Sequence, residues 1–109
     1  MGISRFKAEE LKSIAFGSII ASYAAIGSAY AHPISKIYIA NLTDALLVFS
    51  FDGTTDHFVL PTEGILVLDI TIEDTKSDYL PKGGSLYVKR IGTPSTGSVY
   101  VTTFYGLEG

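Results

Sequence analysis

From His32 onward, short apolar runs alternate with turn residues at regular spacing. The pair Asp52-Gly53 and the segment Pro61-Thr62-Glu63-Gly64 favour tight turns, because glycine tolerates and proline fixes the backbone angles that turns need. The apolar runs cover residues 34–42, 45–52, 56–60, 65–72, 85–91 and 98–105. This pattern predicts an all-β fold, a single β-sandwich or small jelly-roll domain of about seven strands with an extended N-terminal segment.

Side-chain alternation within these runs predicts the core. Ile65 and Val67 would lie on the face opposite to the core and leave it partly apolar, so a second interface could cover that face. The chain has seven tyrosines and no tryptophan, which indicates a half-exposed sheet face or a protein interface. The predicted core positions are Leu47, Phe49, Phe51, Leu66, Leu68, Ile70, Val99 and Val101.

The segment between Lys12 and Lys36 contains no formally charged residue. It is long enough to cross a bilayer, but serine and glycine dilute its hydrophobicity and leucine is absent from its apolar part. It also resembles a signal peptide that ends in Ala29-Tyr30-Ala31 before His32, although Glu9 and Glu10 are unusual in the basic region of such a signal. The interpretation we prefer is an extended arm, and no membrane contact is expected.

We therefore expect an N-terminal part, residues 1–31, and a β-sandwich body, residues 32–109. A short helix would begin at Ser4 and end at Leu11, and an arm strand would follow from Ile14. The arm would lie along a neighbouring subunit, and its removal would leave a folded, monomeric body. The expected interface residues are Phe16, Ile19, Ile20, Tyr23 and Ile26.

Composition excludes several classes of function. The 109 residues carry a net charge of −3, which argues against direct nucleic-acid binding. The absence of cysteine excludes disulfides, thiolate metal sites and a cysteine nucleophile. Only 17% of the residues are charged against 47% hydrophobic, which suits a subunit that is surrounded by neighbours.

No motif for catalysis, cofactor binding or metal binding is present. The two histidines, His32 and His57, lack a partner at metal-ligand spacing. The densest polar cluster runs from Asp52 to His57, and it offers too few oxygen ligands at the positions that a calcium loop needs. We expect Asp52 and Asp56 to bind backbone amides of the turn. We therefore predict a protein that is not an enzyme, with no cofactor and no metal.

A set of segments spread over nearly the whole chain carries a family resemblance. They are Arg5–Leu11, Ala15–Ile19, Ile39–Asp44, Phe49–Gly53, Leu80–Gly83, Gly97–Val101 and Phe104–Gly106. Their combination resembles small structural proteins of tailed bacteriophages. The resemblance implies a β-rich virion component that occurs in rings at the head–tail junction or tail, or as a capsid accessory subunit.

The function expected first is therefore that of a phage structural protein, a subunit of a head–tail connector, neck or tail ring. It would form a homo-oligomeric ring and contact other virion proteins such as portal, adaptor, tail or capsid proteins, in a virion that is assembled in the host cytoplasm. A capsid decoration protein is the alternative within that class. A secreted β-sandwich that binds carbohydrate or a receptor is the alternative from another class.

Overall fold

The computed structural model describes residues 5–69 and 82–107, and within them the chain forms nine strands and one 3-10 helix. The strands are β1 (Arg5–Ala8), β2 (Lys12–Ala15), β3 (Ala24–Ala25), β4 (Lys36–Asn41), β5 (Leu47–Ser50), β6 (Phe58–Leu60), β7 (Ile65–Asp69), β8 (Tyr87–Arg90) and β9 (Ser98–Leu107). The short helix η1 spans Phe16–Ser18. The prediction of an all-β chain is confirmed for the described residues.

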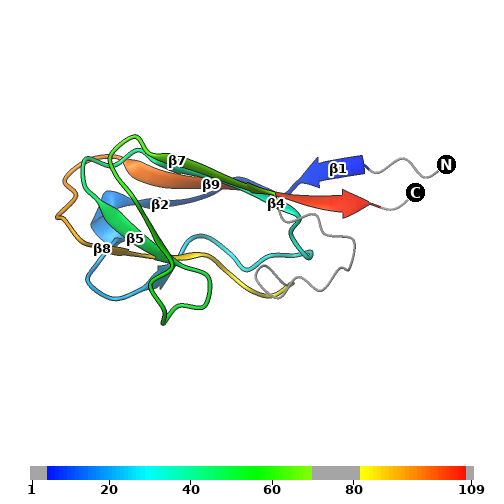
Figure 1. The fold of residues 1–109 in the computed structure, drawn as a ribbon, viewed down its shortest axis with the longest axis horizontal. Helices are drawn as coiled ribbons and strands as arrows, with labels where there is room; N and C mark the ends of the chain where they lie inside the picture. The colour runs from blue at the N-terminus through cyan, green and yellow to red at the C-terminus, as the bar shows by residue number, and fades with distance from the viewer. Residues whose placement is uncertain (1–4, 70–81, 108–109) are drawn as a thin grey trace.

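The strands form two antiparallel sheets, one above the other in Figure 1. The five-stranded sheet has the order β1-β9-β4-β7, and β2 pairs with β9 on the same edge as β1. The four-stranded sheet has the order β3-β8-β5-β6. Two packed antiparallel sheets are consistent with the predicted β-sandwich.

The core lies between the two sheets. Among the predicted core residues, Leu47, Phe49, Val99 and Val101 are fully buried. Phe51, Leu66 and Leu68 are partly buried and pack against the same cluster. The core prediction is thus confirmed for these positions, and Ile70 lies outside the described residues.

The helix expected between Ser4 and Leu11 is wrong where the structure describes the chain. Residues 5–8 form β1, which pairs with β9 in the register Lys7↔Tyr105. The backbone N–H of Glu9 continues the contact by donating to the carbonyl of Thr103 at 2.9 Å. Helix propensity differs by at most about 0.7 kcal/mol among ordinary residues, so pairing with a long strand overrides it. Ser4 lies outside the described residues.

The segment from β2 to β4 is part of the sandwich. β2 pairs with β9 in one sheet and β3 pairs with β8 in the other, so the segment crosses from one layer to the next. It places five side chains in the core, those of Ile14, Ile19, Ile26, Tyr30 and Ile34. Residue 31 is therefore not a boundary between two packing units in the described structure.

Candidate functional site

The five residues expected on a neighbouring subunit are placed differently from one another. Ile19 and Ile26 are only 3% and 1% exposed in the chain's own core. The two side chains close the interior of the sandwich itself, whereas the sequence predicts them at a contact with a neighbour. Phe16 and Ile20 remain on the surface, and Tyr23 is half-buried.

Tyr23 belongs to a surface cluster with Asp56 and Lys89. Its hydroxyl donates a hydrogen bond to the Asp56 carboxylate, and Lys89 Nζ lies 3.3 Å from the same carboxylate. Lys89 Nζ also lies 4.5 Å from the centroid of the Tyr23 ring, within range of a cation–π contact. The hydrogen bonds from Tyr23 and Lys89 lower the pKa of Asp56. The cluster ties the N-terminal segment to β8 and to the loop 51–57.

Asp52 fills the turn role that its sequence position predicts. Its Oδ1 accepts hydrogen bonds from the backbone N–H groups of Thr55 and Thr54, both at 2.8 Å. These bonds hold the pKa of Asp52 well below its ordinary value. The prediction that Asp52 binds turn amides is confirmed. Asp56 differs, because its carboxylate contacts the side chains of Tyr23 and Lys89.

The loop 51–57 lies over part of the outer face of the four-stranded sheet. Gly53, at a φ of 84°, stands so close to Tyr87 that an added Cβ would lie 3.4 Å from the ring. Its backbone N–H donates to Ser50 Oγ at 2.8 Å. Val48 and Ser50, which alternate with the core-facing residues of β5, are buried as well. The loop therefore covers the part of this face around Tyr87 and Ser50.

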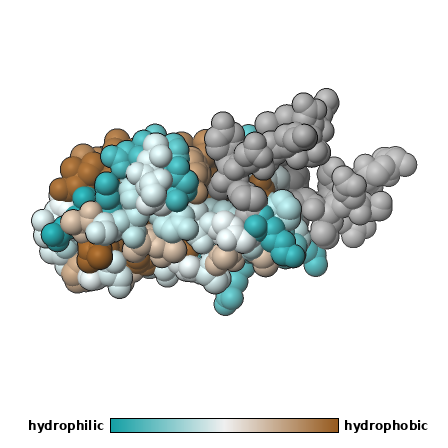
Figure 2. Space-filling model, turned by 90° about the horizontal axis from the view of Figure 1, so that it is seen from below, coloured by the Kyte–Doolittle hydropathy of each residue, from teal (hydrophilic) through white to brown (hydrophobic). Residues whose placement is uncertain are grey.

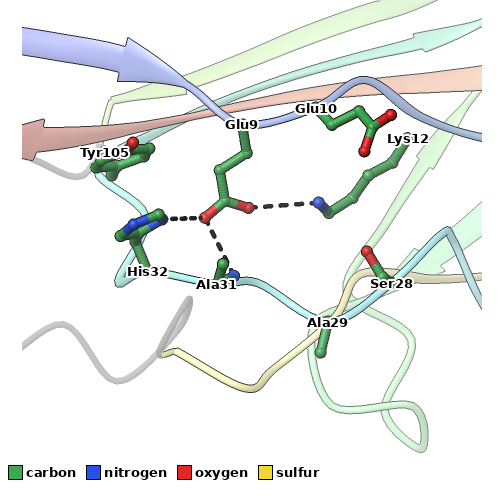
Figure 3. Close-up of a pocket in the computed structure, with 8 residues that line it drawn as sticks. All are labelled: Glu9, Glu10, Lys12, Ser28, Ala29, Ala31, His32 and Tyr105. Carbon is green, nitrogen blue, oxygen red and sulfur yellow. Dashed lines mark hydrogen bonds and ion pairs between the residues drawn. The ribbon is translucent and has the colours of Figure 1, made fainter.

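A polar pocket of about 230 Å³ lies beside the link between β1 and β2 (Figure 3). The Glu9 carboxylate accepts hydrogen bonds from the backbone N–H of Ala31 at 3.1 Å and from Thr103 Oγ1 at 3.3 Å. It also contacts His32 Nδ1 at 2.8 Å and Lys12 Nζ at 3.3 Å. The pocket is lined by Glu9, Glu10, Lys12, Ser28, Ala29, Ala31, His32 and Tyr105.

Glu9 acts as a structural anchor in this pocket. Burial raises its pKa, but the hydrogen bonds from His32 and Lys12 outweigh burial, and the net pKa lies below its ordinary value. Its side chain is only 6% exposed, and both oxygens are engaged. A carboxylate held ionised by four partners is poorly placed to exchange a proton in catalysis. The contacts instead join three distant segments of the chain.

The described residues contain no group of three or more histidine, aspartate or glutamate side chains placed to hold a metal ion.

Among the described residues, the hydroxyl of Tyr30 is a buried side-chain polar atom without a hydrogen-bond partner. Burial, together with the charge of Glu9, raises the pKa of this phenol. The carboxylates of Glu9, Asp52 and Asp56, in contrast, all have hydrogen-bond partners within the chain.

The outer face of the five-stranded sheet has the opposite character, because large apolar side chains are exposed on it. Tyr38 on β4 pairs with Val67 on β7, and Ala40 pairs with both Ile65 and Tyr100, so these residues share one face. Tyr38, Ile65, Val67 and Tyr100 are 38%, 54%, 58% and 37% exposed. We call these four residues the open sheet face.

Charge is nearly absent from this surface in the described part of the chain. The paired residues at one end of the open sheet face are Lys36 and Asp69, whose Nζ and Oδ2 atoms lie 3.9 Å apart. The side of the four-stranded sheet, seen from below in Figure 2, is largely pale and teal across its middle, with brown patches toward one end. The two faces of the sandwich differ in part: the loop 51–57 lies over Tyr87 and Ser50 on one face, where Val59 stays exposed, and the other face exposes four large apolar side chains.

Comparison of the chain with models of protein families, with curated proteins and with solved structures finds no match. Among the described residues, no helix has the length and apolar character that crossing a membrane requires.

The sequence predicts part of the open sheet face but gives no sign of the pocket at Glu9. Ile65 and Val67 interrupt the alternation of their run, which indicates an apolar outer face. Tyr38 and Tyr100 join them only through the strand register, which the sequence does not encode locally. The partners of Glu9 lie as far away as Thr103, so no local motif could have identified them.

Proposed function

We propose that this protein is a non-enzymatic structural protein that assembles with copies of itself, as a subunit of a neck or tail ring in a tailed-phage particle. The observation that carries the proposal is the open sheet face, on which Ile65 and Val67 are each more than half exposed. Contiguous apolar surface on a soluble domain commonly marks a protein interface.

Burial of this face would favour association. Full burial of a large apolar side chain contributes about 1.5–3 kcal/mol, and Tyr38 and Tyr100 add rigid aromatic surface of the kind enriched at interfaces. The charges in the neighbouring row, Lys36 and Asp69, already face each other. Another protein surface can therefore cover the face without leaving an unpaired charge in that row.

The assignment to a phage particle rests on the resemblance of the sequence and on two agreeing properties of the chain. The chain is an all-β sandwich in its described part, and few of its residues are charged. The polar clusters at Glu9, Asp52 and Asp56 are occupied by internal contacts, which supports a structural over an enzymatic role. A capsid accessory protein would share these properties and differ in symmetry.

The test is light scattering of the purified full chain at micromolar concentration, together with electron microscopy of the same sample. We expect a mass several times that of the monomer and closed rings in the images. A trimer would favour the capsid accessory alternative instead. A monodisperse monomer would contradict self-assembly.

A further inference from the structure

We infer that β7 pairs with β7 of a second copy of this chain, antiparallel about a two-fold axis at Val67, so that two five-stranded sheets join into one. This inference rests on the proposed function, because it names one contact between copies. A two-fold contact joins copies in pairs and sets their open sheet faces side by side, so a closed ring also needs a second, heterologous contact. Three properties of β7 support it: an edge with which no other described strand pairs, the residues that it leaves half-covered, and its charge.

The four sheet edges of the described structure differ in how they are protected. β3 has two residues, and β6 has three and is followed by Pro61, so both offer little backbone for pairing. β1 and β2 are short, separate strands of four residues each, and β1 carries the exposed cation Lys7. Charged residues, proline and short length are the devices that keep a sheet edge from pairing with another chain.

β7 has none of these devices between Ile65 and Leu68. Its sequence is Ile-Leu-Val-Leu followed by Asp69, without lysine, proline or glycine. Within the described residues, β4 is the only strand paired with β7. As far as residues 5–69 and 82–107 show, one edge of β7 therefore presents backbone N–H and C=O groups beside aliphatic side chains, which is the pattern that adds a strand.

The inner side of β7 is incompletely covered as well. Leu66 and Leu68 point toward the core but are only partly buried, whereas their partners Ile39 and Ile37 on β4 are fully buried. The sandwich is thus less closed at the β7 edge than one strand further in. A second β7 would bring its own leucines against these two and extend the shared core.

Self-pairing requires a surface that tolerates its own copy. An isologous contact brings the same surface patch of the two copies together, and the Lys36–Asp69 pair leaves no net charge in that row. Centring the pairing on Val67 sets Leu66 opposite Leu68 of the second copy. It also sets the two Asp69 carboxylates at opposite ends of the paired strands, about 13 Å apart along the strand direction.

Disulfide trapping tests this geometry, because the chain contains no cysteine of its own. In a pair centred on Val67, the two copies of this residue lie directly opposite each other, with their Cα atoms about 4.5–5.5 Å apart, within disulfide range. Two copies of Ile65, on the same strand and face, would lie about 13 Å apart along the strand and out of range. Val59, 51% exposed on β6, is a matched control on the other sheet.

The experiment oxidises the full-length variants Val67→Cys, Ile65→Cys and Val59→Cys, and it measures covalent dimer on non-reducing gels after circular dichroism has shown that each is folded. We expect dimer from Val67→Cys alone, with at least about a tenfold excess over the other two. Equal trapping at 65 and 67 would indicate stacked faces and overturn the edge pairing. If Val67→Cys forms no covalent dimer while the wild-type chain still oligomerises, this inference alone is overturned. If Val67→Cys forms no covalent dimer and the wild-type chain is a monomer, the proposed function is overturned too.

Discussion

Replacement of Asn41 by alanine should destabilise the fold strongly, because this fully buried side chain joins three segments. Its Nδ2 donates to the carbonyls of Ala45, Leu60 and Pro61 at 2.9, 3.0 and 3.1 Å. Its Oδ1 accepts from the backbone N–H of Thr43 at 3.0 Å and from the hydroxyl of the same residue at 2.6 Å. No other residue type presents two donors and an acceptor in this shape.

The magnitude follows from these contacts. A buried hydrogen bond contributes about 1 kcal/mol net, and three carbonyls share the two amide hydrogens, so we expect Asn41→Ala to lower the free energy of unfolding by about 3–5 kcal/mol. That is a large share of the about 5–15 kcal/mol that stabilises a typical domain. Thr43→Val removes only the hydroxyl contacts and should cost about 1–2 kcal/mol.

The assay is urea unfolding followed by far-ultraviolet circular dichroism at one fixed protein concentration, because self-association shifts apparent stability. The midpoint should fall while the slope with urea stays unchanged. Thr62→Ala, at an exposed position of the neighbouring turn, is the control and should change stability by less than about 0.5 kcal/mol. A loss below about 1 kcal/mol for Asn41→Ala would refute the argument.

Three further outcomes are expected. The pKa of Glu9 is lowered in the folded chain, so the stability that this group contributes is present above its ordinary pKa of 4.5 and is lost as the pH falls through its pKa in the folded state. Glu9→Gln should therefore make the free energy of unfolding depend less on pH, which urea midpoints between neutral pH and about pH 3 would measure. Gly97→Ala should lower the melting temperature while Gly17→Ala does not, because Gly97 has a φ of 90° and an added Cβ would lie 2.0 Å from the Leu42 carbonyl oxygen, whereas nothing lies within 4 Å at Gly17. Deletion of residues 1–31 should abolish cooperative thermal unfolding, since it removes four core side chains; a folded truncated chain would show that the core closes without them.

The sequence predicts the strands of the body well because their signals are local. β5 lies within the predicted run 45–52, and β7 lies within 65–72, where aliphatic residues end at turn residues. Position within a strand then decides burial, so the alternation alone assigns Phe49 and Val101 to the core. For such residues, the two-residue period of a strand is enough to predict which side chains are buried.

The N-terminal segment could not be predicted in the same way. Small residues on both sides of the run from Ile14 to Ala31 give no clear period, and the pairing of β2 with β9 spans most of the chain. The surplus of apolar residues in this segment suggests an arm for a neighbour, whereas the structure uses Ile19 and Ile26 internally. Composition predicts that such residues must be covered, but not by which surface.

The polar anchor at Glu9 is equally hidden in the sequence. Its carboxylate meets His32 and Thr103 only after β1 has paired with β9, and both partners are ordinary residues in their local sequence. A buried glutamate is identified by its partners, which lie far apart in the chain. The open sheet face stands between these cases, since the sequence indicates Ile65 and Val67 but not the tyrosines beside them.

Light scattering of two matched lysine variants tests whether the open sheet face is the surface of assembly. Val67 and Val59 are the same residue type at similar exposure, 58% and 51%, on edge strands of the two different sheets. Lysine on an edge strand opposes pairing without disturbing the core. We predict that Val67→Lys is folded and assembles to a lower mass than the wild type, and that Val59→Lys keeps the wild-type mass. A Val67→Lys variant that keeps the wild-type mass, or a wild-type chain that is itself monomeric, would contradict the assignment.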